Sequence, residues 1–464
     1  MSEHKIINKY LNYCVLGIGQ SGKSVINFLH KSGIKNIFAS ETSTTFEIKN
    51  LLKNLKNEKI ITDFEIGEHS DKVLDCDVII ASPGINTNLK IFKKIKEKNI
   101  DLISELEFGY RALNTKNIIA VSGTNGKTTT VNILHEILKM YNKESFLCGN
   151  VGTPITEIVN NTNENSFVVI EASSYQLELI KNFHPTKAGL TNITPDHLYR
   201  YGSIEKYAEI KFKIFENQNK NDISVINIDD KFCEKISKVL NLKQKITLKT
   251  FSLTDKKADI FYDLKDKTIN YPILNWKFDT KKLKIFGLHN VQNIMLSILL
   301  LKEIIETDNC KKLEKLLENF IGIEHRLEFV AEIDGAKYIN DSKSTNFDST
   351  KIAIRAFDNY GKNIILILGG QHKGFSFEGL SSLIDKNVKS LVLFGEAKER
   401  LTDELKNFKN IIIIENDLEN SLKAIKKIVK KNDIILFSPG CASFDQFKNF
   451  EHRGEHFKKL VLNT

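Results

Sequence analysis

The chain has 464 residues, which is too long for one hydrophobic core and predicts about two to four domains. Its composition is 41% hydrophobic and 27% charged, as in ordinary globular proteins. The sequence shows no ~20-residue apolar run and no cleavable leader, which argues against membrane insertion and secretion. It also has no Cys-x-x-Cys pair, which argues against a zinc or disulfide framework. The charge of +9 is interspersed with acidic residues, so we expect a cytosolic protein that binds anionic small molecules and no nucleic acid.

A strand, a glycine-rich loop and a helix open the chain. The apolar run from Tyr13 to Ile18 overlaps Gly17-Ile18-Gly19-Gln20-Ser21-Gly22, which precedes a helical pattern. This Gly-x-Gly-x-x-Gly spacing lets a diphosphate approach backbone N–H groups in a Rossmann-like fold. Two further strands end near Glu41 and Thr42 and at Ser82, where the loops of a parallel sheet would line one crevice. The alternative that these loops are ordinary turns stays open.

A second loop of this kind is more informative. The apolar run from Ile118 to Val121 leads into Gly123-Thr124-Asn125-Gly126-Lys127-Thr128-Thr129 and a new helical pattern. A helix N-terminus after such a loop favours bound phosphate because N–H groups and the peptide dipoles point at the anion. Lys127 would reach the β- and γ-phosphates of a nucleotide, and Thr128 would hold Mg²⁺.

Three residues downstream of this loop are candidates for metal chemistry. Glu171 ends a buried strand, which is where nucleotide hydrolases place an acid that serves Mg²⁺. His197 follows the next strand and is a candidate second ligand. Lys211 sits among apolar helix residues, where a bare ammonium is unfavourable. We therefore expect it either to extend to solvent or to be neutralised chemically.

The rest of the chain alternates strands and helices. A helix with Asn290 and Asn293 on one face precedes a change of domain at residues 324–328. Strands are then expected at residues 338–340, 363–368, 390–394, 411–414 and 433–437, each followed by a polar or glycine-rich loop. The sequence thus predicts an α/β fold with three domains, a Rossmann-like parallel sheet (1–113), a central P-loop ATPase-type domain (114–322) and a C-terminal Rossmann-like domain (323–464).

Taken in order, several motifs resemble those of one family. They are Gly123 to Thr129, Asp196-His197, Leu288-His289-Asn290, Glu324-His325-Arg326 and Asn340-Asp341-Ser342-Lys343. Together they resemble the Mur ligases, ATP-dependent amide-bond ligases of peptidoglycan precursor synthesis. The stretches 341–346 and 438–454 look most like the member that adds D-glutamate to UDP-N-acetylmuramoyl-L-alanine.

The resemblance implies a reaction and a distribution of substrates. The first domain would hold the UDP-sugar, the second ATP with two Mg²⁺ ions, and the third D-glutamate. ATP would phosphorylate the substrate carboxylate to an acyl phosphate, which the amine of D-glutamate then attacks. We expect a monomer whose partners are these three small molecules.

The resemblance also implies residue roles. Lys127, Glu171, His197, Lys211 and Lys343 would be catalytic, with Thr128 and Glu171 on one Mg²⁺, and His197 and a carbamylated Lys211 serving the metal site as well. The nucleotide would contact Gly123 to Thr129, Asn290 at adenine, Asp341 at ribose and Arg326 at phosphate. The UDP-sugar would meet Gly19, Gln20, Ser21, Thr42, Ser82 and Asn150, and D-glutamate would meet Thr345, Lys373, Ser443 and the backbone of Phe450.

The sequence departs from the family pattern in the loop Gly370-Gln371-His372-Lys373 and at two further places. Tyr199 stands where the family usually has a second acid, and the loop after Ser40 lacks a Thr-Arg pair. Alternatives are a folylpolyglutamate-synthase-like ligase, which would not need residues 1–112, and a nicotinamide-dependent oxidoreductase, in which Glu41 would anchor the ribose. A nucleotide-dependent regulator is a third alternative.

Overall fold

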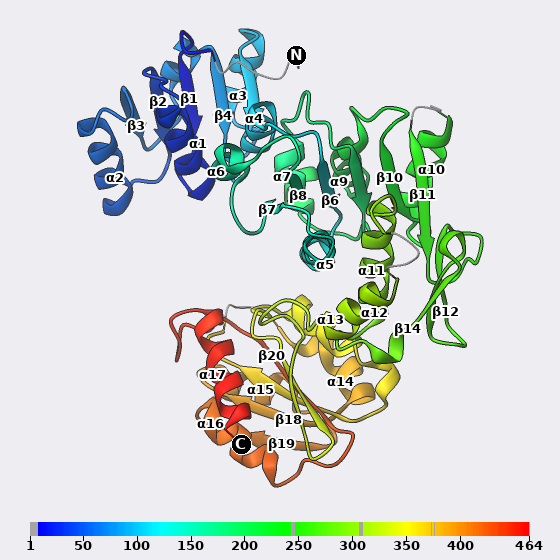
Figure 1. Cartoon of the computed structure of the whole chain (residues 1–464). Helices are drawn as coiled ribbons and strands as arrows, with labels where there is room; N and C mark the ends of the chain where they lie inside the picture. Colours follow the sequence, from blue (N-terminus) through cyan, green and yellow to red (C-terminus); the bar gives the residue numbers. More distant parts are fainter. Residues whose placement is uncertain (1–7, 243–245, 306–309, 373, 375, 464) are drawn as a thin grey trace. The chain divides into compact units, whose positions relative to one another are not determined.

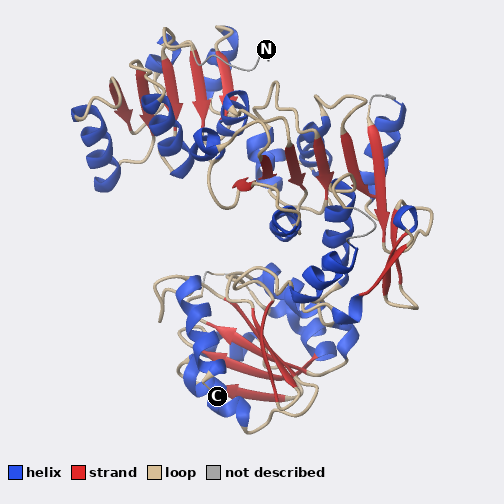
Figure 2. Ribbon diagram, in the orientation of Figure 1, coloured by secondary structure: helices blue, strands red, loops and turns tan. Residues whose placement is uncertain are grey.

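The computed structural model describes residues 8–463 except 243–245, 306–309, 373 and 375. Three largely parallel sheets with helices packed on them account for the chain, which confirms the predicted α/β class (Figures 1 and 2). The chain divides into two compact units, Met1–Phe278 with Gln292–Lys312, and Asp279–Val291 with Leu313–Thr464. Two sheets lie in the first unit, so the predicted boundaries at 113 and 322 stay predictions. Among the described residues, no helix combines the length and apolar character needed to span a bilayer.

The first sheet is parallel and has the order β3-β2-β1-β4-β5. Its strands are β1 (Tyr13–Leu16), β2 (Ile37–Glu41), β3 (Asp63–Ile66), β4 (Val78–Ala81) and β5 (Asp101–Ser104), and its helices are α1 (Gln20–Lys31), α2 (Phe46–Asn57), α3 (Lys90–Glu97) and α4 (Glu105–Ala112). Leu16 at the end of β1 lies opposite both Ser40 and Ala81. This register brings the loops after β1, β2 and β4 to one edge, as the sequence predicts.

The second sheet has the order β14-β13-β12-β11-β10-β9-β6-β8-β7. Its strands are β6 (Ile118–Ser122), β7 (Ser145–Gly149), β8 (Phe167–Glu171), β9 (Lys187–Leu190), β10 (Ile223–Asn227), β11 (Thr247–Ser252), β12 (Ile260–Asp263), β13 (Thr268–Tyr271) and β14 (Trp276–Asp279). Its helices are α5 (Lys127–Met140), α6 (Ile155–Ile158), α7 (Ser174–Leu177), α8 (Leu198–Tyr201), α9 (Ile204–Phe212), α10 (Lys231–Leu242) and most of α11 (Leu288–Leu300). The next helix, α12 (Cys310–Asn319), belongs to the second unit from Leu313 onward. β12 and β13 form an antiparallel hairpin that the sequence analysis did not predict.

Two buried glutamates of α4 join the first sheet to the second. Glu105 accepts hydrogen bonds from the backbone N–H and the hydroxyl of Thr156, each at 2.9 Å. Glu107 accepts three consecutive backbone N–H groups, those of residues 181–183, at 2.8–3.0 Å. Because buried carboxylates require such partners, α4 fixes the segment after α7 against the first sheet.

The third sheet forms the core of the second unit. Its order is β15-β16-β20-β17-β18-β19, with only β15 antiparallel to its neighbour. The strands are β15 (Glu328–Ile333), β16 (Ala336–Asn340), β17 (Ile364–Gly369), β18 (Val388–Phe394), β19 (Ile411–Ile414) and β20 (Ile434–Gly440), and the helices are α13 (Phe347–Arg355), α14 (Ser381–Asn387), α15 (Lys398–Glu404), α16 (Leu418–Lys426) and α17 (Phe450–Leu462). Apolar side chains cover both faces of the sheet.

Candidate active site

The loop between β6 and α5 requires glycine at two positions. Gly123 has φ +136° and Gly126 has φ +87°, a region that side chains disfavour. A Cβ on Gly123 would lie 1.9 Å from Thr191 Oγ1, and one on Gly126 would lie 2.3 Å from Asn293 Oδ1. Both glycines therefore permit a tight turn in which neighbouring chain segments approach the backbone.

The same loop is braced from the side and remains accessible. Asn192 accepts the backbone N–H groups of Thr124 and Asn125, through its carbonyl at 2.8 Å and its Oδ1 at 3.1 Å. Lys127 Nζ donates to the carbonyl of Thr124 at 2.8 Å. Residues 124–127 are half-buried, whereas Thr128 and Thr129 are buried. A phosphate can thus reach the start of α5, which the predicted phosphate-binding role of this loop requires.

Glu171, at the end of β8, has a carboxylate suited to a cation. It is 1% exposed, and its Oε1 accepts from Asn150 Nδ2 at 2.9 Å. Its Oε2 is buried without a hydrogen-bond partner among the described residues. A buried orphan carboxylate oxygen is unfavourable unless something positive meets it. The site therefore fits Mg²⁺, a hard cation that binds oxygen ligands.

Lys211 is a buried amine beside the phosphate loop. It is 2% exposed, and its Nζ donates to the carbonyl of Gly123 at 2.7 Å, the same oxygen that accepts from Lys127 Nζ at 3.0 Å. Burial, together with the charge of Lys127, lowers the pKa of Lys211 well below its ordinary value, against the opposing effects of Asp196 and Glu171. The side chain does not extend to solvent, which contradicts the first of the two alternatives predicted for it, and its chemical modification stays a prediction.

His197 begins the turn before α8, in a left-handed conformation with φ +51°. Its Nδ1 lies 2.9 Å from the hydroxyl of Tyr175. Burial lowers the pKa of His197, as do the positive charges of Lys211 and Lys127. The charges of Lys127 and Lys211 therefore act on His197, and the charge of Glu171 acts on Lys211.

The loops of the first sheet enclose a cavity of about 470 Å³. Its lining includes Gly19, Gln20, Ser21, Thr42 and Ser82, five of the six residues predicted for the UDP-sugar. The sixth, Asn150, instead bonds Glu171. The structure thus gathers these five residues from three strand ends into one concave surface, and their role in binding stays a prediction.

Glu41 and His69 complete this cavity. Glu41 accepts the backbone N–H groups of Ile18 at 2.6 Å and Ser43 at 2.9 Å. Burial acts to raise its pKa, but these donors outweigh burial and hold the pKa below its ordinary value. His69, whose Nδ1 lies 2.7 Å from Ser40 Oγ, was not predicted, although its position three residues after β3 was a usable signal.

In the second unit, Asp341 is buried at the end of β16. Its Oδ2 accepts from the Ser438 hydroxyl at 2.7 Å and its Oδ1 from the backbone N–H of Leu327 at 3.1 Å. Burial raises the pKa of Asp341 to about 7. Arg326, half-buried beside Leu327, acts to lower that pKa, so the residues predicted for ribose and phosphate lie near each other.

Asn290 lies on the part of α11 that belongs to this unit. It is buried, and its Nδ2 donates to the carbonyl of Phe286 at 2.7 Å. Its neighbour His289 has a pKa lowered to about 4 by burial and by the charge of Arg326. The nucleotide residues of this unit are thus drawn together around Arg326.

Of the residues predicted for D-glutamate, Phe450 begins α17 and Ser443 lies in the loop before that helix. Lys343 Nζ lies 5.9 Å from the ring centre of Phe450, the first residue of that helix. Ser443 is buried and Thr345 is half-buried. Lys373 lies outside the described residues. Backbone N–H groups at the start of α17 and a nearby ammonium suit a carboxylate.

Arg453 is the functional candidate that sequence reasoning missed in this unit. It is fully buried and donates to the hydroxyl and carbonyl of Ser342 at 3.1 and 2.9 Å, and to the carbonyls of Cys441 and Ala442 at 3.1 Å. Burial lowers its pKa to about 10, so it stays cationic at neutral pH. One guanidinium thus fastens two loops whose neighbouring residues were assigned to D-glutamate.

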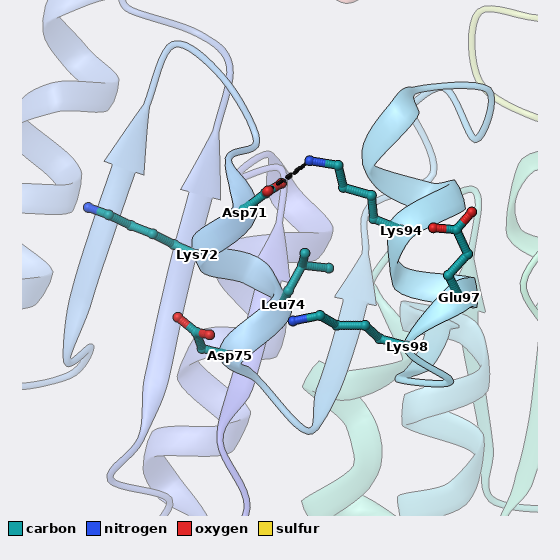
Figure 3. A pocket seen from close by; sticks show the side chains of 7 residues that line it. All are labelled: Asp71, Lys72, Leu74, Asp75, Lys94, Glu97 and Lys98. Atoms are coloured by element: carbon teal, nitrogen blue, oxygen red, sulfur yellow. Dashed lines mark hydrogen bonds and ion pairs between the residues drawn. The ribbon is translucent and has the colours of Figure 1, made fainter.

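Two other clusters of charged side chains resemble binding sites, but their charges pair with one another. A hollow between α3 and the 3-10 helix at Asp71–Asp75 is lined by both signs of charge, and Lys94 pairs with Asp71 at 2.6 Å (Figure 3). Glu324, His325 and Glu455 could together meet a metal ion, yet the ammonium of Lys458 pairs with both carboxylates. Neither feature calls for a further cation.

Family models match most of the chain. The MurD N-terminal domain matches residues 12–91, the Mur ligase middle domain 121–301, and the Mur ligase glutamate ligase domain 325–441. The UDP-N-acetylmuramoylalanine–D-glutamate ligase of Elusimicrobium minutum is 38% identical over 455 residues and 96% of each chain. The enzyme of that name from Caldicellulosiruptor bescii is 37% identical over 459 residues, 97% of each chain.

The chain belongs to the Mur ligase family. Solved structures agree at the level of the fold. UDP-N-acetylmuramate-alanine ligase MurC from Thermotoga maritima superposes with a TM-score of 0.56 at 19% identity, covering 98% of this chain and 100% of that one. MurF from Acinetobacter baumannii gives 0.56 at 17% identity, covering 84% and 86%. The predicted Mur ligase resemblance and three-domain fold are confirmed.

In this Mur ligase, three supporting residues escaped sequence reasoning besides Arg453. Asn192 braces the phosphate loop, Tyr175 bonds His197, and His69 lines the first cavity. Asn192 follows β9 and Tyr175 lies four residues after Glu171, so both stand near strand ends that the sequence analysis considered. Their partners lie 67 and 22 positions away, so periodicity could not pair them.

Proposed function

We infer that the chain is an ATP-dependent ligase that joins D-glutamate to UDP-N-acetylmuramoyl-L-alanine in peptidoglycan precursor synthesis. The observation that supports this most directly is the convergence of two lysines on the Gly123 carbonyl beside a carboxylate with an unpartnered oxygen. That arrangement suits transfer of a phosphoryl group to an anion. The similarity of the whole chain to ligases of this name supports the choice of substrates.

The reaction proceeds in two steps. A carboxylate oxygen of the UDP-linked substrate attacks the γ-phosphorus of ATP, the bond to the β-γ bridging oxygen breaks, and ADP leaves. The amine of D-glutamate then attacks the acyl carbon, loses a proton, and expels phosphate. Lys127 and the N–H groups at the start of α5 stabilise the charge on the phosphoryl oxygens, which offsets repulsion between two anions.

Thr128 and Glu171 would hold one Mg²⁺, and His197 with a carbamylated Lys211 would hold a second. Bound Mg²⁺ supplies positive charge and orients phosphate oxygens. The depressed pKa of Lys211 supports the modification, since a neutral amine can attack carbon dioxide, form an N–C bond and release a proton. The product is an anionic oxygen ligand, which suits a hard cation better than an ammonium does.

We propose that the cavity of the first sheet binds the uridine diphosphate and that the loops held by Arg453 bind D-glutamate. The buried positive charge of Arg453 lies near Ser443 and Phe450, and it draws a dicarboxylate toward those loops. We also propose that the protein is a monomer located in the cytosol.

The alternatives are not favoured. An oxidoreductase would need Glu41 for a ribose, but its carboxylate already accepts two backbone N–H groups of its own sheet. A folylpolyglutamate-synthase-like enzyme would not need residues 12–91, which match the MurD N-terminal domain.

Phosphate release tests the proposal. Purified protein with ATP and Mg²⁺ should release phosphate only when both UDP-N-acetylmuramoyl-L-alanine and D-glutamate are present. L-glutamate and D-aspartate serve as controls for the amine, and UDP-N-acetylmuramic acid for the carboxylate. Equal release with all acceptors, or hydride transfer from a nicotinamide cofactor, would contradict the assignment.

A further inference from the structure

A buried ion pair lies between the cavity of the first sheet and the turn that carries His197. Arg200 of α8 donates from Nε and Nη2 to the two carboxylate oxygens of Glu178, at 2.7 and 2.8 Å. The two side chains are 8% and 7% exposed. A two-pronged pair removed from water is strong and fixes the relative orientation of its partners.

Each member of this pair also bonds the loop after β4. Arg200 Nη2 donates to the carbonyl of Ile85 at 2.8 Å, and the hydroxyl of Thr87 donates to Glu178 Oε2 at 2.9 Å. Ile85 lines the cavity assigned to the UDP-sugar. The ion pair is therefore attached to one wall of that cavity.

On its other side, the pair reaches the histidine of the metal site. The guanidinium of Arg200 lies over the ring of Tyr175, 4.3 Å from its centre, and the hydroxyl of Tyr175 is 2.9 Å from His197 Nδ1. The backbone N–H of Arg200 also donates to the carbonyl of His197 at 2.9 Å. A histidine that binds metal through one ring nitrogen is normally oriented by a hydrogen bond at the other.

The backbone at Glu178 provides a fixed anchor. The carbonyl of Leu179 accepts the N–H of Ser104 in the first sheet at 3.1 Å, and Lys213 Nζ donates to the carbonyl of Glu178 at 3.1 Å. Slightly further along the chain, Glu107 accepts the backbone N–H groups of residues 181–183. Arg200 thus ties the short helix α8 to a point that is already part of the first sheet.

We propose that Glu178 and Arg200 are positioning residues that hold His197 at a set place relative to the 82–89 loop, so that binding of the UDP-linked substrate and binding of the metal are coupled. This proposal rests on the proposed function of the two sites. Neither side chain touches a reacting atom. Removing the contact of Thr87 with Glu178 should therefore weaken metal binding, although Thr87 lies in the loop after β4 and not at the metal site.

The test compares two variants that differ by one hydroxyl. Thr87→Val removes the donor to Glu178 at constant shape, whereas Thr87→Ser keeps it. Affinity for UDP-N-acetylmuramoyl-L-alanine is measured by calorimetry in EDTA without ATP, and affinity for Mn²⁺ by electron paramagnetic resonance with a non-hydrolysable ATP analogue. We expect Thr87→Val to weaken both affinities, each by more than about twofold and up to roughly tenfold, and Thr87→Ser to change neither by more than about twofold.

Arg200→Lys is the second variant, because lysine cannot reproduce the two-pronged contact of Arg200 with Glu178. It should weaken Mn²⁺ binding by about 10- to 100-fold. Arg400→Ala, which breaks a pair between Arg400 and Glu404 in the second unit, is the control and should leave both affinities unchanged.

Three results would overturn the coupling. They are a Thr87→Val variant that loses only substrate affinity, one that matches Thr87→Ser in both measurements, and an Arg200→Lys variant that melts earlier but binds Mn²⁺ normally. Both readouts are binding constants. A wild-type protein that binds both ligands yet releases no phosphate would therefore contradict the proposed function while leaving this comparison decisive.

Discussion

The first unit contains two glycine loops with the same backbone design and different surroundings. One joins β1 to α1 through Gly17 and Gly22, and the other joins β6 to α5 through Gly123 and Gly126. In both, a buried strand enters a turn where a Cβ would strike backbone or side-chain atoms, at 2.0 Å for Gly22. In both, a helix begins where an anion could meet backbone N–H groups.

The side chains around the loops differ in charge. Near the first loop, Glu41 binds the backbone N–H of Ile18, and none of the described residues that line the cavity is a lysine. At the second, Lys127 and Lys211 both donate to the Gly123 carbonyl. The backbone alone suffices to hold a phosphate, whereas transferring one requires added positive charge. The first loop is therefore suited to binding a phosphate, and the second is suited to transferring one.

The largest expected difference is between lysines in the first turns of the two helices. Lys127→Ala should lower kcat by about 10³-fold, since it removes charge stabilisation of the transferred group. Lys23→Ala, an exposed position in α1, should change kcat by less than about twofold. Steady-state phosphate release measures both, with melting curves to check folding. Similar losses in the two variants would remove the distinction between the loops.

Lys211→Ala tests the chemistry next to the second loop. We expect a loss of about 10²-fold in kcat, because an oxygen ligand of the metal disappears. Excess bicarbonate or a small carboxylic acid such as acetate should restore part of it by supplying that oxygen from solution.

Lys211→Arg is the control for this experiment, since it keeps a cation that cannot be carbamylated and should not respond to acetate. Unchanged phosphate release by Lys211→Ala would exclude the residue from the site.

The glycines provide a comparison of stability. Gly126→Ala should lower the free energy of unfolding of the first unit by about 1–3 kcal/mol, since φ is +87° and Asn293 Oδ1 is 2.3 Å from the new Cβ. Gly19→Ala meets nothing within 4 Å and should stay within about 0.5 kcal/mol of the wild type. Urea denaturation followed by far-ultraviolet circular dichroism distinguishes them, and equal effects would show that the second loop is not strained.

The smallest expected effect concerns Glu41 and pH. The pKa of Glu41 is lower in the folded protein than its ordinary value, so its stabilisation is present above the ordinary pKa and is lost as pH falls through the folded pKa. At pH 7, Glu41→Gln should be less stable than the wild type by about 1 kcal/mol.

That difference should shrink as pH falls below ~4.5, the range in which the wild-type carboxyl becomes protonated. Urea midpoints measured from pH 3 to 7 check the prediction. Glu58→Gln, at an exposed acid that follows α2, should show no such trend. A constant gap between Glu41→Gln and wild type across this range would contradict the role of the charged form.

Much of the fold followed from local patterns. The expected strands at 363–368, 411–414 and 433–437 agree with β17, β19 and β20 to within a few residues, because an apolar run followed by a polar or glycine-rich loop is a local signal. The β12–β13 hairpin was missed, since Tyr262 and Ile269 pair within a short segment that has weak alternation. Sheet order was also beyond local patterns.

The sequence by itself predicted two candidate phosphate loops, because glycine spacing and a following helix are local signals, and the order of its motifs indicated the family. Only the tertiary structure decided that Lys211 shares a carbonyl with Lys127, that Arg453 fastens two loops, and that Glu178 meets Arg200. The hydrogen bonds of Arg453 join residues 11 to 111 positions apart, and the pair of Glu178 and Arg200 joins residues 22 positions apart on separate elements. They depend on strand order and helix packing, and no local periodicity encodes them.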